Sequence, residues 1–196
     1  MNYSLPHTIE SHLGEILTFK SIRHEPDGDV LIAHSFTQPG SGPPMHTHWL
    51  QDEGFTVLEG RIGYQMAGQP AQYAGPGESV VFKRGVSHRF WNAGSEVLHC
   101  EGWLKPANHF VFFLSSVYAA QNKSGKAQPE LFDAAYLLTR YASEYKMDNI
   151  PPFVTKVVMP VVYRLGKLLN KYEHFKNAPE PIQQVPVLMN NMDTVG

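Results

Sequence analysis

The distribution of glycine divides this chain into two parts. Of the 16 glycines, only Gly125, Gly166 and Gly196 follow residue 105. Glycine allows tight turns at low steric cost, so we expect the first part to turn often. Between its glycines lie short segments rich in β-branched and aromatic residues, at residues 15–20, 30–36, 54–58, 62–66, 79–82, 88–91 and 97–103. Many short strands separated by turns predict an antiparallel sandwich or barrel.

The second part has helical patterns. Residues 106–122 begin with a proline and end shortly before a glycine, as helices often do. Within residues 129–146, apolar residues recur at spacings of three and four, which predicts an amphipathic helix. Residues 152–175 predict a third helix, kinked at Pro160 because proline removes an internal hydrogen bond. We therefore divide the chain into three segments: a barrel over 1–105, a helical extension over 106–176 and an irregular tail over 177–196.

Composition predicts a folded, soluble protein. The chain has 196 residues, of which 42% are hydrophobic and 12% aromatic, enough to build a core. A net charge of −2 argues against a nucleic-acid binder that neutralises phosphates. The N-terminal residues show no secretory signal pattern and no segment resembles a membrane span, so we expect a cytoplasmic protein.

Ten histidines against one cysteine imply that any bound metal needs imidazole and carboxylate ligands. His46 and His48 are two residues apart, so on a strand both side chains project from the same face. If the chain turns after His48, Glu53 can return to the same point from a neighbouring strand. Two histidines and a carboxylate form a facial set used for Fe(II) and tolerated by Mn, Ni, Co and Zn. His88 begins a later strand, and spacing alone does not bring it to the other three.

Two segments of the chain resemble the paired motifs of the cupin family. The first motif, a glycine, His-x-His, a glutamate and a second glycine, is matched at Gly40, His46, His48, Glu53 and Gly60. The second is matched at Gly77, Gly85, His88 and Asn92. Lys83 stands where proline is usual, a departure that concerns a turn and not a ligand. Both motifs fall within residues 40–92, in order and in spacing, and the resemblance covers residues 28–105.

The resemblance implies a mainly β fold, a single-domain jelly-roll β-barrel, to which the chain adds a C-terminal α-helical extension. By carry-over, one divalent transition metal (Fe, Mn, Ni, Co or Zn) is held inside the barrel by His46, His48, Glu53 and His88. The alternatives are a polar strand face without a metal, and a cupin barrel that holds none in the cell. Because cupins often dimerise through their sheets, the resemblance also implies a homodimer.

Alternation along the strands predicts further pocket residues. The candidates for substrate binding are Phe55, Tyr64, Met66 and Phe90. His34 and His99 are further candidates for the substrate site, as hydrogen-bond partners behind the ligands. The competing interpretation places the aromatic residues and the methionine in the core, and the two histidines in the core or facing solvent. The sole cysteine, Cys100, is expected to be a small core residue.

These features predict a metal-dependent, oxygenase-like enzyme that acts on a small, partly apolar organic molecule. Glu53 is the candidate catalytic residue, since a labile carboxylate ligand can shuttle a proton. Two other interpretations stay open: a non-catalytic small-molecule sensor, and a non-redox isomerase or hydrolase. For the basic helix at residues 152–175 we expect docking on the protein, with a lid over the barrel or peripheral contact with an anionic membrane as alternatives.

Overall fold

The structure is a computed structural model that describes residues 3–183. Most of its strands precede its helices, and turns separate the strands as the glycine distribution predicts. The strands are β1 (His7–Ser11), β2 (Glu15–Arg23), β3 (Val30–Thr37), β4 (His46–His48), β5 (Asp52–Glu59), β6 (Ile62–Met66), β7 (Gln72–Ala74), β8 (Ser79–Phe82), β9 (His88–Asn92), β10 (Leu98–Lys105) and β11 (Tyr145–Met147).

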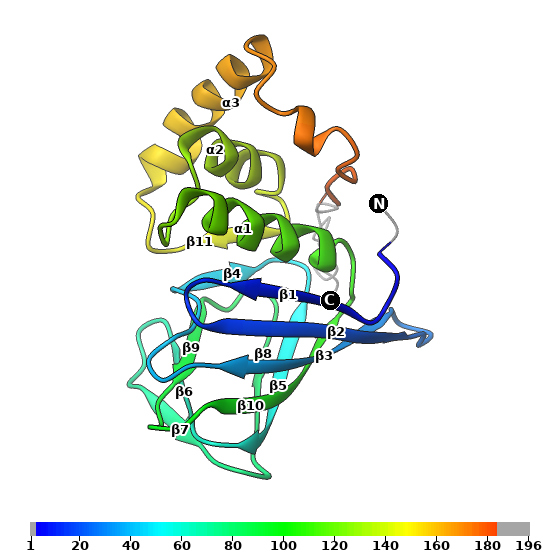
Figure 1. Cartoon of the computed structure of the whole chain (residues 1–196), viewed down its shortest axis with the longest axis vertical. Helices are drawn as coiled ribbons and strands as arrows, with labels where there is room; N and C mark the ends of the chain where they lie inside the picture. The colour runs from blue at the N-terminus through cyan, green and yellow to red at the C-terminus, as the bar shows by residue number, and fades with distance from the viewer. Residues whose placement is uncertain (1–2, 184–196) are drawn as a thin grey trace, which may run out of the picture.

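The strands of the described residues form two antiparallel sheets. One has six strands in the order β1-β2-β3-β10-β5-β8, and the other has five in the order β11-β4-β9-β6-β7. Several neighbouring strands, such as β3 and β10 or β4 and β9, come from distant parts of the chain, as in a jelly roll. The helices gather at one end of the barrel (Figure 1). The prediction of a mainly β barrel with a C-terminal helical extension is confirmed.

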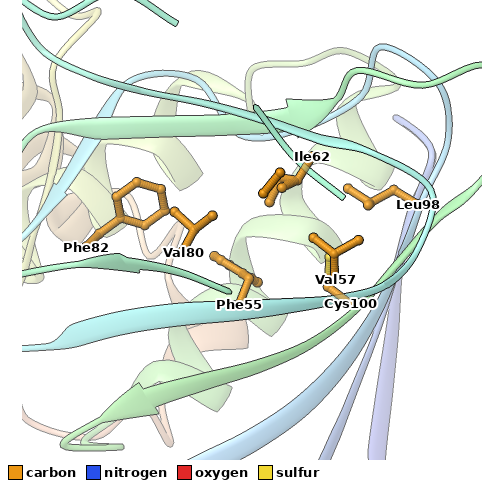
Figure 2. Packing of buried hydrophobic residues seen from close by; sticks show 8 residues of the cluster. Phe55, Val57, Ile62, Val80, Phe82, Leu98 and Cys100 are labelled. Carbon is orange, nitrogen blue, oxygen red and sulfur yellow. The ribbon is translucent and has the colours of Figure 1, made fainter. Parts of the chain in front are cut away.

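The barrel core lies between the two sheets. Phe55 and Val57 share one face of β5 because they are two residues apart, and they meet Ile62 and Phe82 from other strands (Figure 2). Burying one such side chain contributes roughly 1.5–3 kcal/mol to folding. Cys100 is 1% exposed in the same cluster, and burial raises the pKa of its thiol to about 12. A thiol that stays protonated is a core residue and not a nucleophile, as predicted.

The helices stack in layers above the barrel (Figure 1). α1 (Phe110–Ser124) packs against β1, and α2 (Leu131–Arg140) packs against α1 and α3 (Met159–Leu168). Two short elements, the π-helical η1 (Val154–Val158) and the 3-10 helix η2 (Glu173–Phe175), flank α3. α1 ends at Gly125, which adopts a left-handed φ of 65° that favours glycine. A second hydrophobic cluster holds these helices together, formed by Phe112, Tyr136, Leu137, Tyr141, Tyr145 and Phe175.

The prediction of one helix over residues 129–146 is wrong at its C-terminal end. α2 stops at Arg140, and Tyr145 begins β11, which pairs antiparallel with β4. In that register Tyr145 lies opposite His48 and Met147 lies opposite His46. β4 would otherwise leave one side of its backbone unpaired, and pairing with β11 satisfies those groups. A tertiary hydrogen-bond requirement therefore overrides the local helical periodicity.

The predicted third helix over residues 152–175 is also shorter and differently built. It consists of η1 followed by α3, and it ends at Leu168, just before Asn170 turns with a left-handed φ of 53°. Pro160 lies in the first turn of α3, where its missing N–H costs little. Instead of a kink at Pro160, the helix has widened π-helical turns in η1. Such turns accommodate a break in the helical hydrogen-bond ladder. In residues 3–183, no helix combines the length and apolar character needed to cross a membrane.

Candidate metal centre

Three strands bring the four sequence-predicted ligands together. β4 carries His46 and His48, β5 carries Glu53, and β9 carries His88. His46 and His88 lie directly opposite each other in the β4–β9 pairing. One ligand atom from each of the four side chains lies within 4.8 Å of all the others. Glu53 returns to the histidines as predicted, but from β5 of the other sheet and not from a strand paired with β4. His88 reaches the group through the β4–β9 pairing, which spacing alone does not reveal.

Two backbone carbonyls orient the imidazoles. Nδ1 of His46 donates to the carbonyl of Pro44 at 2.8 Å, and Nδ1 of His88 donates to the carbonyl of Val86 at 2.8 Å. These bonds leave Nε2 of each ring as the coordinating atom. Nε2 of His88 lies 2.9 Å from Oε2 of Glu53. With its proton on Nδ1, a neutral His88 would point the lone pair of Nε2 at Oε2 of Glu53, and the two atoms would repel each other. A proton or a metal ion shared between these two atoms removes that repulsion.

Burial and neighbouring side chains shift the pKa values of three residues of the cluster. His48 is 4% exposed, and desolvation lowers its pKa to about 3. Desolvation lowers the pKa of His46 as well. Burial by itself raises the pKa of Glu53, but His48, the hydrogen bond from His88 and the charge on the other imidazoles together lower it to about 2. A neutral His46, a neutral His48 and an ionised Glu53 are the forms that bind metals, so these donors fit a divalent ion.

Aromatic rings pack around the histidines. Phe82 stacks on His88 with ring centroids 4.0 Å apart and planes 8° apart. Tyr145 meets His48 edge-on at 5.4 Å, and Phe110 of α1 lies 5.6 Å from the same ring. Within residues 3–183, Nδ1 of His48 has no hydrogen-bond partner. The ring of His48 is therefore positioned by aromatic contacts from β11 and α1, not by a carbonyl.

Asp148 connects two of the ligand-bearing strands. Its Oδ2 accepts hydrogen bonds from Thr47 at 2.5 Å and from Ser87 at 2.8 Å. Thr47 lies between the two histidines of β4, and Ser87 precedes His88. Lys146 pairs with the same carboxylate. Sequence reasoning missed Asp148, because nothing local marks a carboxylate that is 101 residues from Thr47 and 61 residues from Ser87.

A large cavity opens beside the cluster. Its volume is about 1050 Å³, and His46, His48 and Glu53 form part of its wall. The rest of the wall is mainly apolar and comes from both parts of the chain, with Leu31, Ala33, Phe55 and Leu104 from the barrel and Leu114, Val117, Leu137 and Met159 from the helices. The helical extension therefore encloses the space next to the predicted ligands.

The predicted substrate-binding residues divide into two groups. Phe55 and Phe90 line the cavity. Tyr64 and Met66 are not among the lining residues of the described chain and pack against the barrel core instead. The hydroxyl of Tyr64 donates to Gln72 at 2.9 Å, on an exposed part of the sheet. Core packing, the competing interpretation, accounts for these two.

His34 and His99 face away from the cavity. They hydrogen bond to each other at 3.1 Å, and His99 stacks on Phe36, which is 41% exposed. The neighbours Ala33 and Ser35 line the cavity, so alternation along β3 turns His34 to the outer surface. The structure therefore does not place either histidine behind the metal ligands.

Comparison with known proteins identifies the barrel. The family model described as "Cupin domain" matches residues 34–101, which include all four candidate ligands. These residues form a cupin domain, and the chain is a cupin-domain protein.

Two curated relatives carry oxidoreductase names. "Probable oxidoreductase virH" from Hypocrea virens is 34% identical over 123 residues, which cover 61% of this chain and 48% of the relative. "Oxidoreductase iacF" from Pestalotiopsis fici is 29% identical over 146 residues, covering 66% of this chain and 70% of the relative. The chain thus spans about half the length of the first relative.

Solved structures with similar folds cover part of this chain. KdgF from Halomonas sp. is 16% identical, with a TM-score of 0.45, over 54% of this chain and 92% of that chain. The cupin domain of Cnp3 from Schizosaccharomyces pombe is also 16% identical, with a TM-score of 0.42, over 64% of this chain and 80% of that chain.

Proposed function

We propose that this protein is a metal-dependent, oxygenase-like oxidoreductase that acts on a small, largely apolar organic substrate. One observation carries the proposal: four side chains suited to a divalent metal border a mainly apolar cavity of about 1050 Å³. The names of the two curated relatives support the oxidoreductase class.

His46, His48, Glu53 and His88 would hold the metal, which is one of Fe, Mn, Ni, Co or Zn. When bound, such an ion supplies a redox centre or a Lewis acid. Glu53 is the proposed catalytic residue, because its carboxylate, held 2.9 Å from Nε2 of His88, can accept or release a proton at Oε2. Phe55 and Phe90 would orient the substrate and exclude water.

Metal analysis tests this proposal. We expect protein purified without oxygen to contain about one equivalent of a transition metal per chain, and His48→Ala to contain much less. Oxygen consumption by the loaded protein is then measured with a panel of small aromatic and alicyclic compounds. Absence of metal, or equal metal uptake by the wild type and His48→Ala, would contradict the proposal.

The same assays separate the two other candidate functions. Tight binding of a compound without turnover under any metal supports a small-molecule sensor. Turnover by a Zn- or Ni-loaded form without oxygen supports a non-redox isomerase or hydrolase.

We also propose that the outer face of η1 and α3 lies on an anionic membrane surface. Val161 and Leu168 of α3 are 58% and 82% exposed, and Phe153, which directly precedes η1, is 68% exposed. Lys156, Arg164 and Lys167 are exposed beside them, which complements anionic headgroups, whereas a second copy docked on the same face would bring like charges together. The opposite side of the segment does dock on the protein, through Val154 and Met159 in the cavity wall.

Vesicle sedimentation tests this contact. We expect binding to vesicles containing phosphatidylserine, weak binding to pure phosphatidylcholine, and loss of binding in the double variant Arg164→Glu, Lys167→Glu. The matched control Arg23→Glu, Lys20→Glu reverses two charges on β2 and is expected to bind like the wild type. Equal binding by all three proteins would contradict the contact.

The remaining proposals concern assembly and location. We propose a cytoplasmic homodimer that binds a small molecule and no nucleic acid, as the family resemblance and the net charge of −2 suggest. Light scattering after size-exclusion chromatography measures the mass, and a monomer near 22.0 kDa would contradict the dimer.

A further inference from the structure

A carboxylic acid outside the metal cluster also faces the cavity. Glu15 begins β2, directly after the turn at Gly14, and lies opposite Thr37 of β3. Two residues along the same face of β2, Leu17 lines the cavity wall, and so does Glu15 itself. The hydroxyl of Tyr118 on α1 donates to Oε2 of Glu15 at 3.2 Å. The two side chains thus place polar atoms in a mainly apolar wall.

Glu15 is partly buried, and it lacks the cationic partner that a carboxylate removed from water usually has. Within residues 3–183 its carboxylate forms no ion pair, and the only hydrogen bond to this carboxylate comes from Tyr118, which leaves Oε1 without a partner. The other charged cavity residues are already engaged, since Arg89 donates to Gln65 and Lys146 pairs with Asp148. Desolvation accordingly raises the pKa of Glu15 to about 6, and the nearby Glu53 adds to the rise.

A purely structural role does not account for this arrangement. α1 is already fastened to the sheet by Asn122, which donates to the carbonyl of Glu10 at 2.7 Å and accepts from the backbone of His12 at 2.9 Å. An apolar pair at Glu15 and Tyr118 would pack the helix without the cost of desolvating a carboxyl group. An acceptor that is left open toward a cavity is instead what a ligand with a hydrogen-bond donor requires.

We propose that Glu15 and Tyr118 form the polar recognition point of the cavity, which binds the hydroxyl group of an otherwise apolar ligand. The hydroxyl donates to Oε1 of Glu15, while Tyr118 holds the carboxylate in place through Oε2. Leu17, Leu114 and Val117 contact the apolar body of the ligand. The substrate class is therefore a phenol or an alicyclic alcohol. The inference rests on the proposed function only in placing the substrate in this cavity.

A matched pair of probes tests the inference. 2-Naphthol can donate a hydrogen bond and 2-methoxynaphthalene cannot, while their apolar rings are the same. By isothermal titration calorimetry we expect the wild type to prefer 2-naphthol by about tenfold, because a hydrogen bond to a charged group contributes at least this much. Equal affinities for the two probes, or no binding of either, would overturn the inference without the need for any variant.

Variants assign the preference to these two residues. Glu15→Gln is expected to reduce the preference to about threefold or less, and Tyr118→Phe to reduce it by a smaller factor. Glu10→Gln, an exposed glutamate on the adjacent β1, is the matched control and should keep the full preference. A preference that persists in Glu15→Gln would show that another group binds the hydroxyl.

The outcome is independent of the metal. If the wild type binds no metal but keeps its preference for 2-naphthol, the proposed function fails and the recognition point stands. If the metal is bound and the preference is absent, the recognition point fails and the metal centre stands.

Discussion

The barrel and the segments that flank it contribute different things to the same cavity. The cupin domain at residues 34–101 carries the four candidate ligands on β4, β5 and β9. The flanking segments supply Tyr145 against His48, Asp148 behind two ligand strands, and Glu15 with Tyr118 in the wall. The barrel thus carries the candidate metal ligands, and its flanks form much of the cavity wall beside them. A shared fold hosts many functions, so the segments that flank the cupin domain are part of what any functional proposal must explain.

The largest effect is expected inside the barrel. His88→Ala removes one nitrogen of the cluster and should weaken metal binding by about 100-fold or more. Metal titration monitored by competition with a chelator measures this. His99→Ala is the matched control, since His99 lies on the outer face of the same barrel, and we expect it to bind metal normally. Equal losses in both variants would mean that the effect is general destabilisation.

We expect the helical extension to unfold together with the barrel and to contribute to the free energy of unfolding of the whole molecule. Leu137 is 3% exposed and joins the helical cluster to the cavity wall, so Leu137→Ala should lower the free energy of unfolding by about 2–3 kcal/mol. Leu168→Ala is the control, because this side chain is 82% exposed, and it should change the free energy of unfolding by about 0.5 kcal/mol at most. Urea denaturation gives both values. Separate unfolding transitions for the barrel and the helices would instead show two independent units.

The pH dependence of stability tests the environment of Glu15. Folding raises its pKa from 4.5 to about 6, so the folded state binds this proton more tightly than the unfolded state. The resulting stabilisation is fully present below pH 4.5 and is lost as the pH rises through about 6. It amounts to about 2 kcal/mol, at 1.36 kcal/mol for each pH unit.

Glu15→Gln isolates this contribution. The difference in free energy of unfolding between wild type and variant should change by about 2 kcal/mol between pH 4.5 and pH 7. Other carboxylates titrate in both proteins and cancel in the difference. A difference that stays constant with pH would mean that Glu15 is well solvated in the folded state.

The smallest effect on metal affinity is expected from Asp148, which follows β11 and hydrogen bonds to residues beside the candidate ligands. Asp148→Asn keeps the size of the side chain but weakens the hydrogen bonds from Thr47 and Ser87, so we expect about a tenfold loss of metal affinity. Asp27→Asn, on an exposed side chain, is the control. Unchanged affinity in Asp148→Asn would show that β4 and β9 hold the ligands without help from the extension.

Much of the fold could be predicted from the sequence. The alternating residues of β6 and β8 fall within the predicted segments 62–66 and 79–82, because each strand is bounded by turns that glycine marks. β11 could not be predicted, because residues 141–147 continue an apolar spacing that is equally compatible with a helix. Residues 145–147 form a strand and not a helix because they pair with the edge of β4, which would otherwise be unpaired. That edge exists only in the folded barrel.

The sequence by itself indicated His46, His48 and Glu53 as candidate metal ligands, because their spacing is a local feature. His88 was added only by the resemblance to the cupin motifs, since its spacing does not bring it to the other three. Tertiary structure alone decided the rest of the site. Strand pairing turned His34 and His99 outward, and long-range contacts brought Glu15 and Tyr118 to the cavity and Asp148 to Thr47 and Ser87. A metal-binding motif is encoded over a few tens of residues, whereas the walls of a cavity are assembled from elements whose separation in sequence carries no periodic signal.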